Sequence, residues 1–144
     1  MTSDVNGRNR ASRERLNGVI ARLGDRDARV DEDWTAAALL AHLAFWDRLA
    51  ASRIAGYLRT GEAPAPAPAI ILEYTNAGGL RQWSDTPLKV AAAQARDAAL
   101  AFDRIVESLP SDKLAYLKGL GRPFLIDRSE HRKEHLDQIE RALA

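Results

Sequence analysis

The sequence predicts an all-α fold and, within that class, a four-helix bundle. Four segments carry apolar residues at spacings of three and four, which is the period of a helix with one buried face. No run alternates apolar and polar residues as a strand does, and no Asn-Gly hairpin signal joins two such runs. The long connection at residues 60–86 allows the second and third helices to run in the same direction. We therefore expect the order up-down-down-up.

The first two predicted helices are residues 12–23 and residues 35–59. The apolar stripe of the first helix consists of Leu16, Val19, Ile20 and Leu23. The second helix begins after an N-cap at Asp33 or Thr35 and ends before Gly61. Its apolar positions are Leu39, Leu43, Phe45, Trp46, Leu49, Ile54 and Tyr57.

The third predicted helix is residues 87–109, and the last begins at Asp127 or Ser129 and ends at Leu143. Prolines stand at the first turn of the third helix and just past its end, where they are best tolerated. The inner face of the third helix consists of Leu88, Ala91, Ala92, Ala95, Ala99, Phe102, Ile105, Val106 and Leu109.

The two long connections have different compositions. Residues 60–86 begin with alternating Ala and Pro, which predicts an extended strap, and continue into a segment where we expect a short helix broken at Gly78 and Gly79. Residues 111–124 contain two glycines and a proline, and we expect them to be irregular. We also expect residues 1–11 to be flexible.

The amino-acid composition limits the classes of protein to which this chain can belong. The 144 residues suit a single domain, residues 1–144, with 46% hydrophobic and 28% charged residues. Basic and acidic side chains number 21 and 20 and are interspersed, so we expect neither a nucleic-acid partner nor a membrane surface. The chain shows no signal or membrane-spanning segment, and we expect a cytoplasmic location. It has no cysteine, which excludes disulfides and thiolate metal ligands.

The chain has only three histidines, and the helical period predicts that all three face inward. His131 and His135 are four residues apart, about 40° on one helix face, and His42 lies on the apolar arc of residues 35–59. Two imidazoles on one helix and a third on a facing helix can bind one divalent metal. Three ligands leave positions open for water or substrate, as in catalytic sites. Imidazole ligands suit Zn, Ni, Fe or Cu, and spacing does not choose among them.

Other interpretations of the histidines stay open. Each histidine can be a hydrogen-bonded core residue, and the segment HRKEH can be a solvated helix face. The same segment matches H-x-x-E-H, the inverted zinc-protease signature. That signature needs a further carboxylate ligand well downstream, but only nine residues follow His135, and Glu134 lies on the polar arc. We therefore disfavour the protease.

Several neighbouring residues are candidates for supporting roles. Asp47 and Glu134 are the nearest carboxylates in sequence that could accept the second N–H of a metal-bound imidazole. Trp46 is one turn from His42 and could form a wall of the site. Asn76 and Arg128 could orient a polar or anionic substrate. The plainer interpretations are solvated charges for the carboxylates, a core tryptophan, a turn asparagine and a surface arginine.

Three stretches resemble the DinB-like superfamily. DEDWTAAALLAHLAFWDR is similar to its second-helix signature, in which a tryptophan and a Ser/Thr precede a helix with an inward histidine. EYTNAGGLRQWSDTPLKVAAAQARDA is similar to its Asn-containing segment before the third helix, and FLIDRSEHRKEHLDQIERAL to its last helix with an H-x3-H pair. The resemblance extends from about residue 12 to residue 143.

The resemblance implies a four-helix bundle, generally dimeric, in which His42, His131 and His135 bind a divalent metal. Characterised members include thiol-dependent S-transferases and a maleylpyruvate isomerase that use mycothiol, bacillithiol or glutathione, and others are hydrolytic or resistance proteins. The mycothiol-dependent isomerases can have a glutamate where His131 stands.

Two function hypotheses follow. The first is a metal-dependent enzyme that acts on a small molecule, as an S-transferase with a low-molecular-weight thiol or as a hydrolase. The second is a non-catalytic bundle that binds or sequesters a small molecule, as a resistance protein does.

Overall fold

The computed structural model describes residues 4–144, which form six α-helices, one 3-10 turn and no strand. The elements are α1 (Val5–Leu23), α2 (Ala36–Thr60), α3 (Ala69–Ser84), α4 (Leu88–Glu107), α5 (Ser111–Gly119), η1 (Pro123–Leu125) and α6 (Ser129–Leu143). The predicted all-α class is confirmed for this part of the chain. No helix between residues 4 and 144 has the length and apolar character needed to cross a membrane.

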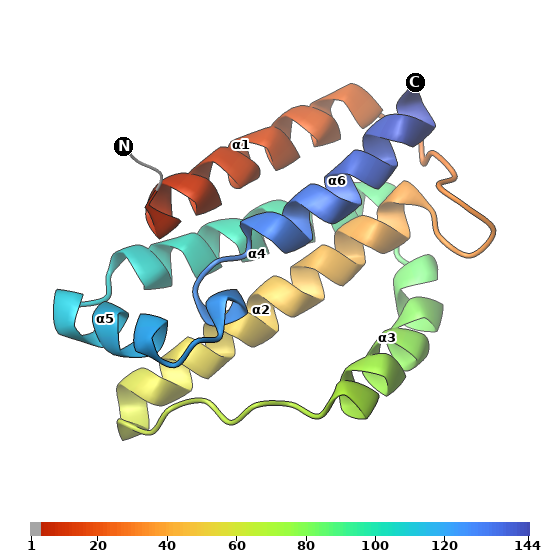
Figure 1. Cartoon of the computed structure of the whole chain (residues 1–144). Helices are drawn as coiled ribbons and strands as arrows, with labels where there is room; N and C mark the ends of the chain where they lie inside the picture. Colours follow the sequence, from red (N-terminus) through yellow and green to blue (C-terminus); the bar gives the residue numbers. More distant parts are fainter. Residues whose placement is uncertain (1–3) are drawn as a thin grey trace.

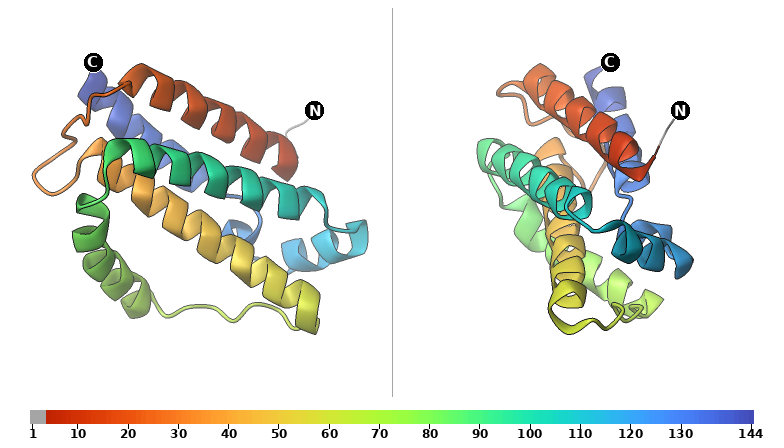
Figure 2. Two further views of the ribbon diagram at one scale, coloured as in Figure 1. Left: turned by 180° about the vertical axis from the view of Figure 1, so that it is seen from behind. Right: turned by 90° about the vertical axis from the view of Figure 1, so that its left-hand side faces the viewer.

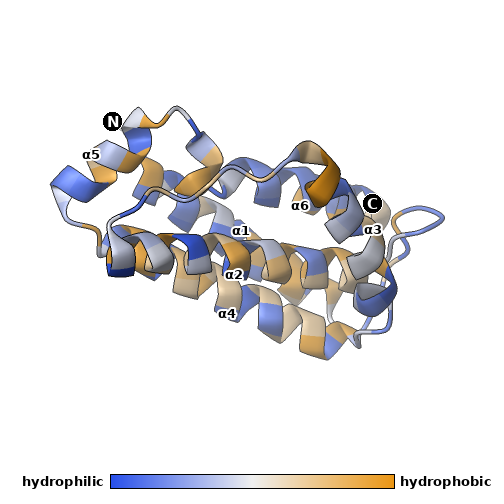
Figure 3. Ribbon diagram, turned by 90° about the horizontal axis from the view of Figure 1, so that it is seen from below, coloured by the Kyte–Doolittle hydropathy of each residue, from blue (hydrophilic) through white to orange (hydrophobic). Residues whose placement is uncertain are grey.

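The four longer helices α1, α2, α4 and α6 lie side by side (Figure 1, Figure 2). α1 and α6 run in one direction, and α2 and α4 run in the other. α2 packs along α4 and also touches α6, while α1 lies against α6 and α4. Apolar residues recur in successive turns of α2 and α4, as Figure 3 shows. This arrangement places one face of α2 against the last helix, where the paired histidines are.

α1 begins earlier than the sequence predicted. The Asp4 side chain accepts a hydrogen bond from the backbone of Gly7 and caps the helix, which starts at Val5. Residues 1–11 were expected to be flexible, but they are helical from Val5 onward, while residues 1–3 lie outside the described part of the chain. Asn9, in this first part of α1, is only 1% exposed. The added turns are held by the hydrogen bonds of Asn9 to the backbone of Ile126 and Arg128 and by Val5, which is buried in the core cluster that includes Phe102.

α3 is continuous, so the predicted break at Gly78 and Gly79 is wrong. A Cβ on Gly79 would lie 2.5 Å from the ring of Trp83. Gly79 therefore serves the close approach of this ring, and the helix tolerates it at a cost of about 1 kcal/mol relative to alanine. Residues 61–68, which contain the Ala-Pro repeats, form no helix, in line with the prediction of a strap.

The prediction that residues 111–124 are irregular is also wrong for its first part, which forms α5. Pro110 ends one helix and precedes the next, since its fixed φ of −57° suits a helix start. Leu117 of α5 is fully buried in the core cluster that also includes Phe102 of α4. Only the segment after Gly119, with Gly121 at φ 72°, departs from helical geometry before α6.

Candidate functional site: a three-histidine pocket

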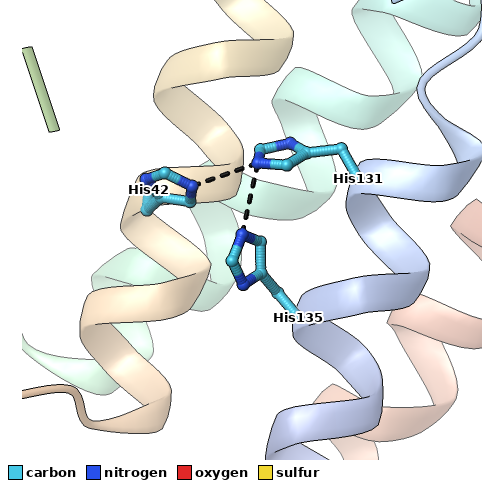
Figure 4. A group of neighbouring side chains, drawn as sticks. All are labelled: His42, His131 and His135. Atoms are coloured by element: carbon cyan, nitrogen blue, oxygen red, sulfur yellow. Dashed lines mark hydrogen bonds between the residues drawn. The ribbon is translucent and has the colours of Figure 1, made fainter. Parts of the chain in front are cut away.

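The structure brings together the three histidines of the chain, His42 from α2 and His131 and His135 from α6 (Figure 4). The Nε2 atom of His131 lies 3.1 Å from Nε2 of His42 and 3.2 Å from Nε2 of His135. One ligand nitrogen from each ring lies within 4.8 Å of the other two. We call these three residues the histidine cluster.

Aromatic rings enclose the α2 side of the histidine cluster. The rings of Trp83 and Trp34 meet the His42 ring edge to face, with centroids 5.0 and 5.4 Å away, and Trp46 lies at 6.4 Å. The side chain of His42 is almost fully buried, at 4% exposure. Such surroundings exclude water and disfavour a charged imidazolium.

Burial keeps two of the rings neutral. It lowers the pKa of His42 to about 3, with smaller contributions from His135 and the positive charge of Arg128. It lowers the pKa of His131 to about 2, again with Arg128 and the other two histidines contributing. Neutral imidazoles retain a lone pair, which is the form that coordinates a metal.

The second nitrogens of the rings have three different environments. Nδ1 of His135 lies 2.7 Å from Oε1 of Gln138, to which it donates, so that its Nε2 carries the free lone pair. Nδ1 of His42 is buried and has no hydrogen-bond partner in the described part of the chain. Nδ1 of His131 lies 2.9 Å from Nη2 of Arg128. Because a guanidinium only donates, Nδ1 of His131 accepts and its proton resides on Nε2. Coordination through that Nε2 therefore requires the other tautomer and a shift of Arg128.

The histidine cluster opens into a pocket of about 810 Å³, a volume typical of small-molecule sites. The three residues predicted to bind substrate, Trp46, Asn76 and Arg128, all border this pocket. Trp46 donates from Nε1 to Oδ1 of Asn76 at 2.8 Å, which ties α3 to α2 at the pocket wall. Apolar lining comes from Leu39, Leu49, Leu72, Phe124 and Leu125 among others.

The two carboxylates proposed as imidazole partners have other positions. Asp47 accepts hydrogen bonds from Arg128 and Arg132, not from a histidine. Glu134 borders the pocket but is exposed on α6. The acceptor that does meet the cluster is Gln138, one turn beyond His135, and an i, i+3 scan from each histidine would have found it.

Sequence reasoning missed a buried ionic group directly beside the histidines. Arg132, fully buried, donates to Asp47 at 3.0 Å and to Asp103 at 2.9 Å, while Arg128 donates to Asp47 and Arg13 to Asp103. We call these five residues the arginine–aspartate network. Although burial opposes it, the charges of both aspartates raise the pKa of Arg132. The available signal was the place of Arg132 one turn before Leu136, on the buried face of α6.

Comparison of the chain with protein-family models, with curated proteins and with solved structures finds no match. The resemblance of the three sequence stretches to the DinB-like superfamily accordingly stays a prediction.

Proposed function

We propose that this protein is a divalent-metal-dependent enzyme whose metal is held by His42, His131 and His135. The observation that carries the proposal is the convergence of three imidazole nitrogens from two facing helices at the base of a pocket. Helical bundles commonly build metal sites in this way, from inward residues on facing helices.

The chemistry of the donor set fits a divalent transition metal such as Zn, Ni or Fe. Nδ1 of buried His42 has no hydrogen-bond partner in the described part of the chain. The position of this ring therefore favours the contacts of Nε2, which faces the cluster, over those of Nδ1. Gln138 fixes the His135 ring with Nε2 toward the cluster, as outer partners of metal-binding histidines do. A ligand set without charge would leave the full positive charge of the metal to act on whatever binds at the open positions.

We also propose that α1, α2, α4 and α6 constitute a four-helix bundle of the DinB-like kind, to which α3 and α5 are additions. Their side-by-side packing and their directions support this assignment. A homodimer belongs to the same proposal. It is supported by exposed apolar side chains on α3, where Ile70, Ile71 and Tyr74 are 48, 51 and 67% exposed. Light scattering at micromolar concentration tests the dimer, and a monomer would remove it.

The reaction we propose is a thiol S-transfer or a hydrolysis on a small molecule. A metal at this site would lower the pKa of a bound thiol or water and supply a nucleophile near neutral pH. Because the chain has no cysteine, the thiol would come from a low-molecular-weight cosubstrate. The residues of the chain then bind the substrate and enclose it. Trp34 and Trp46 limit access of water, and Asn76 and Arg128 offer polar contacts to the substrate.

Metal analysis of protein purified without a histidine tag tests the proposal. We expect about one equivalent of a transition metal in the wild type and its loss in His42→Ala, His131→Ala and His135→Ala, since each removes one of three ligands. Lys133→Ala is the matched control, because Lys133 is exposed on α6 between the two histidines. Equal metal content in all variants would contradict the site. A panel of low-molecular-weight thiols then tests the reaction.

The alternative is a non-catalytic protein that sequesters a small molecule. The observation in its favour is the pocket itself, whose volume and apolar lining suit a ligand without any metal. Metal-free protein that still binds apolar ligands in this pocket would favour the alternative over the enzyme.

A further inference from the structure

Two arginines hold the extended strap at the far end of the pocket from Gln138. Arg53 of α2 donates from Nη2 to the carbonyl oxygen of Ala65 at 2.6 Å, and Arg122 donates from Nη2 to that of Pro64 at 2.6 Å. Ala65 and Pro64 are neighbours in sequence, so their Cα atoms are only about 3.8 Å apart. The two guanidinium groups therefore meet the strap next to each other.

The positive charge at this place has no carboxylate to offset it. Within residues 4–144, neither Arg53 nor Arg122 forms an ion pair, whereas Arg128 has Asp47. Nη1 of Arg122 is buried without any hydrogen-bond partner there. Burial, together with the positive charges of Arg122 and Arg128, lowers the pKa of Arg53. Like charges gathered in a partly buried place, with N–H groups to spare, are an arrangement that an anion would stabilise.

Only Arg53 of the two borders the pocket, where it shares the wall with apolar side chains. A guanidinium has five N–H groups, of which Arg53 uses one for the strap. The remaining planar edge suits a carboxylate, which can accept two parallel hydrogen bonds. Leu49, Leu72 and Phe124 border the same pocket and offer contact to a hydrocarbon or aromatic body.

Three acidic residues, Asp31, Glu130 and Glu134, also line the pocket. Their positions limit where in the pocket an anion can bind. Asp31 lies before α2, near the start of that helix, where its side chain accepts from the backbone of Asp33 and Trp34. Glu130 and Glu134 are exposed on α6. Arg53 lies on α2 well toward its end, three turns beyond His42. Asp31 and Arg53 are thus separated along α2, while the charges of the exposed Glu130 and Glu134 are screened by solvent.

We propose that Arg53 forms an anion-binding subsite that takes the carboxylate of a small ligand whose apolar body rests on Leu49, Leu72 and Phe124. This inference rests on the proposed function in that it names the substrate class of the same pocket, a carboxylic acid whose reacting part reaches the histidine cluster. Arg122 supports the subsite by adding charge and by holding the strap beside Arg53.

The test compares two probes of the same shape, phenylacetate and its neutral amide phenylacetamide, by calorimetry and by tryptophan fluorescence, since Trp34 and Trp46 border the pocket. We expect the wild type to bind the carboxylate more tightly than the amide by on the order of tenfold, the effect of a charge-assisted hydrogen bond. No preference for the carboxylate in the wild type would overturn the subsite.

Variants show which side chain causes the preference for phenylacetate over phenylacetamide. Arg53→Met should abolish it and leave the affinity for the amide unchanged, while Arg53→Lys, which keeps the charge and loses the planar edge, should retain part of it. Arg48→Met is the control, because it removes the same charge from an exposed position on α2 outside the pocket. A preference that survives Arg53→Met in folded protein would overturn the proposal.

His135→Ala separates this inference from the metal site. If the carboxylate binds Arg53, the preference should persist in His135→Ala and after chelation. A preference lost with the metal would mean that the anion coordinates the metal, and the subsite would be wrong. If instead no metal is found but the preference for phenylacetate depends on Arg53, the enzyme proposal fails while the subsite stands.

Discussion

The histidine cluster joins α2 and α6, and the adjacent arginine–aspartate network joins these two helices to α1 and α4. Their buried polar groups are satisfied in opposite ways. In the network, Asp47 accepts from Arg128 and Arg132, and Asp103 accepts from Arg132 and Arg13, so each charge faces an opposite one. In the histidine cluster, nitrogen faces nitrogen, and Nδ1 of His42 has no partner within residues 4–144.

The difference indicates which cluster is structural and which is available for a ligand. Satisfied buried ion pairs fix one arrangement of the helices, and of the network only Arg128 borders the pocket where a molecule could bind. At the point where the three uncharged rings meet, the proton on Nε2 of His131 is the only one shared with Nε2 of His42 and of His135, which is a weak return for their burial. A metal bound after the tautomer of His131 changes would supply a stronger interaction. Arg128 belongs to both groups, since it contacts Asp47 and Nδ1 of His131. The network can therefore influence the orientation and tautomer of a candidate ligand.

The largest effect is expected from breaking the network. Asp47→Ala would leave the guanidinium groups of Arg128 and Arg132 without one of their charge partners, and unpaired buried charges cost about 3–5 kcal/mol. We expect the free energy of unfolding in urea, at neutral pH and with a chelator present, to fall by this amount. Asp97→Ala, at an exposed aspartate on α4, is the control and should cost under about 0.5 kcal/mol. A similar small loss for Asp47→Ala would show that the network is not structural.

The second prediction concerns pH and separates the two clusters directly. Folding lowers the pKa of His42 and His131 from 6.5 to about 3 and 2, so between these values the unfolded chain binds more protons. Their contribution to stability is complete above pH 6.5 and is lost as the pH falls. Each of the two histidines loses about 1.4 kcal/mol of this contribution per pH unit below 6.5, so together they account for roughly 3–4 kcal/mol between pH 6.5 and pH 5.

We expect this loss in urea unfolding of metal-free wild type, and a much flatter profile in the double variant His42→Gln, His131→Gln. Carboxylates of ordinary pKa remain ionised down to about pH 5, so they add little slope in this window. The same slope in wild type and double variant would assign the pH dependence to other groups.

The third prediction sharpens the role of the histidine cluster. Gln138→Leu removes the acceptor of Nδ1 of His135 and should weaken metal affinity about 10- to 100-fold, as is usual for outer partners of metal-binding histidines. Zn or Ni affinity would be measured by competition with a chelator of known strength. Gln94→Leu on the exposed face of α4 is the matched control. Unchanged affinity in Gln138→Leu would mean that this hydrogen bond does not orient a ligand.

The sequence allowed the histidine cluster to be predicted because local periodicity carries the relevant information. Each histidine could be assigned to the inner arc of its own helix, and with few histidines the convergence of arcs followed. The same reasoning placed Leu49 on the inner face, where it is 38% exposed as part of the pocket lining. An apolar period thus gives the direction of a side chain but not whether the core or a cavity receives it.

The network could not be predicted in this way, because its partners are set by tertiary packing. Arg132 meets Asp103, 29 positions away, and Asp47, 85 positions away, and nothing in a local window distinguishes these residues from surface charges. The same limit explains α3, where Gly79 was interpreted as a helix breaker. A glycine is needed at this position because the Trp83 ring packs against it, and the two residues meet only when the helix has formed.

The smallest effect is expected at the outer wall of the histidine pocket. Trp46→Phe keeps the aromatic ring but removes the 2.8 Å hydrogen bond to Asn76, which is worth about 1 kcal/mol. Since α3 packs mainly on α2, we expect faster hydrogen exchange in α3 and little change in the network. Asn76→Ala should have the same effect, and the double variant should cost no more than either single change, which gives a coupling energy near 1 kcal/mol. Additive losses in this cycle would show that Trp46 and Asn76 act independently and that another contact holds α3 across the pocket.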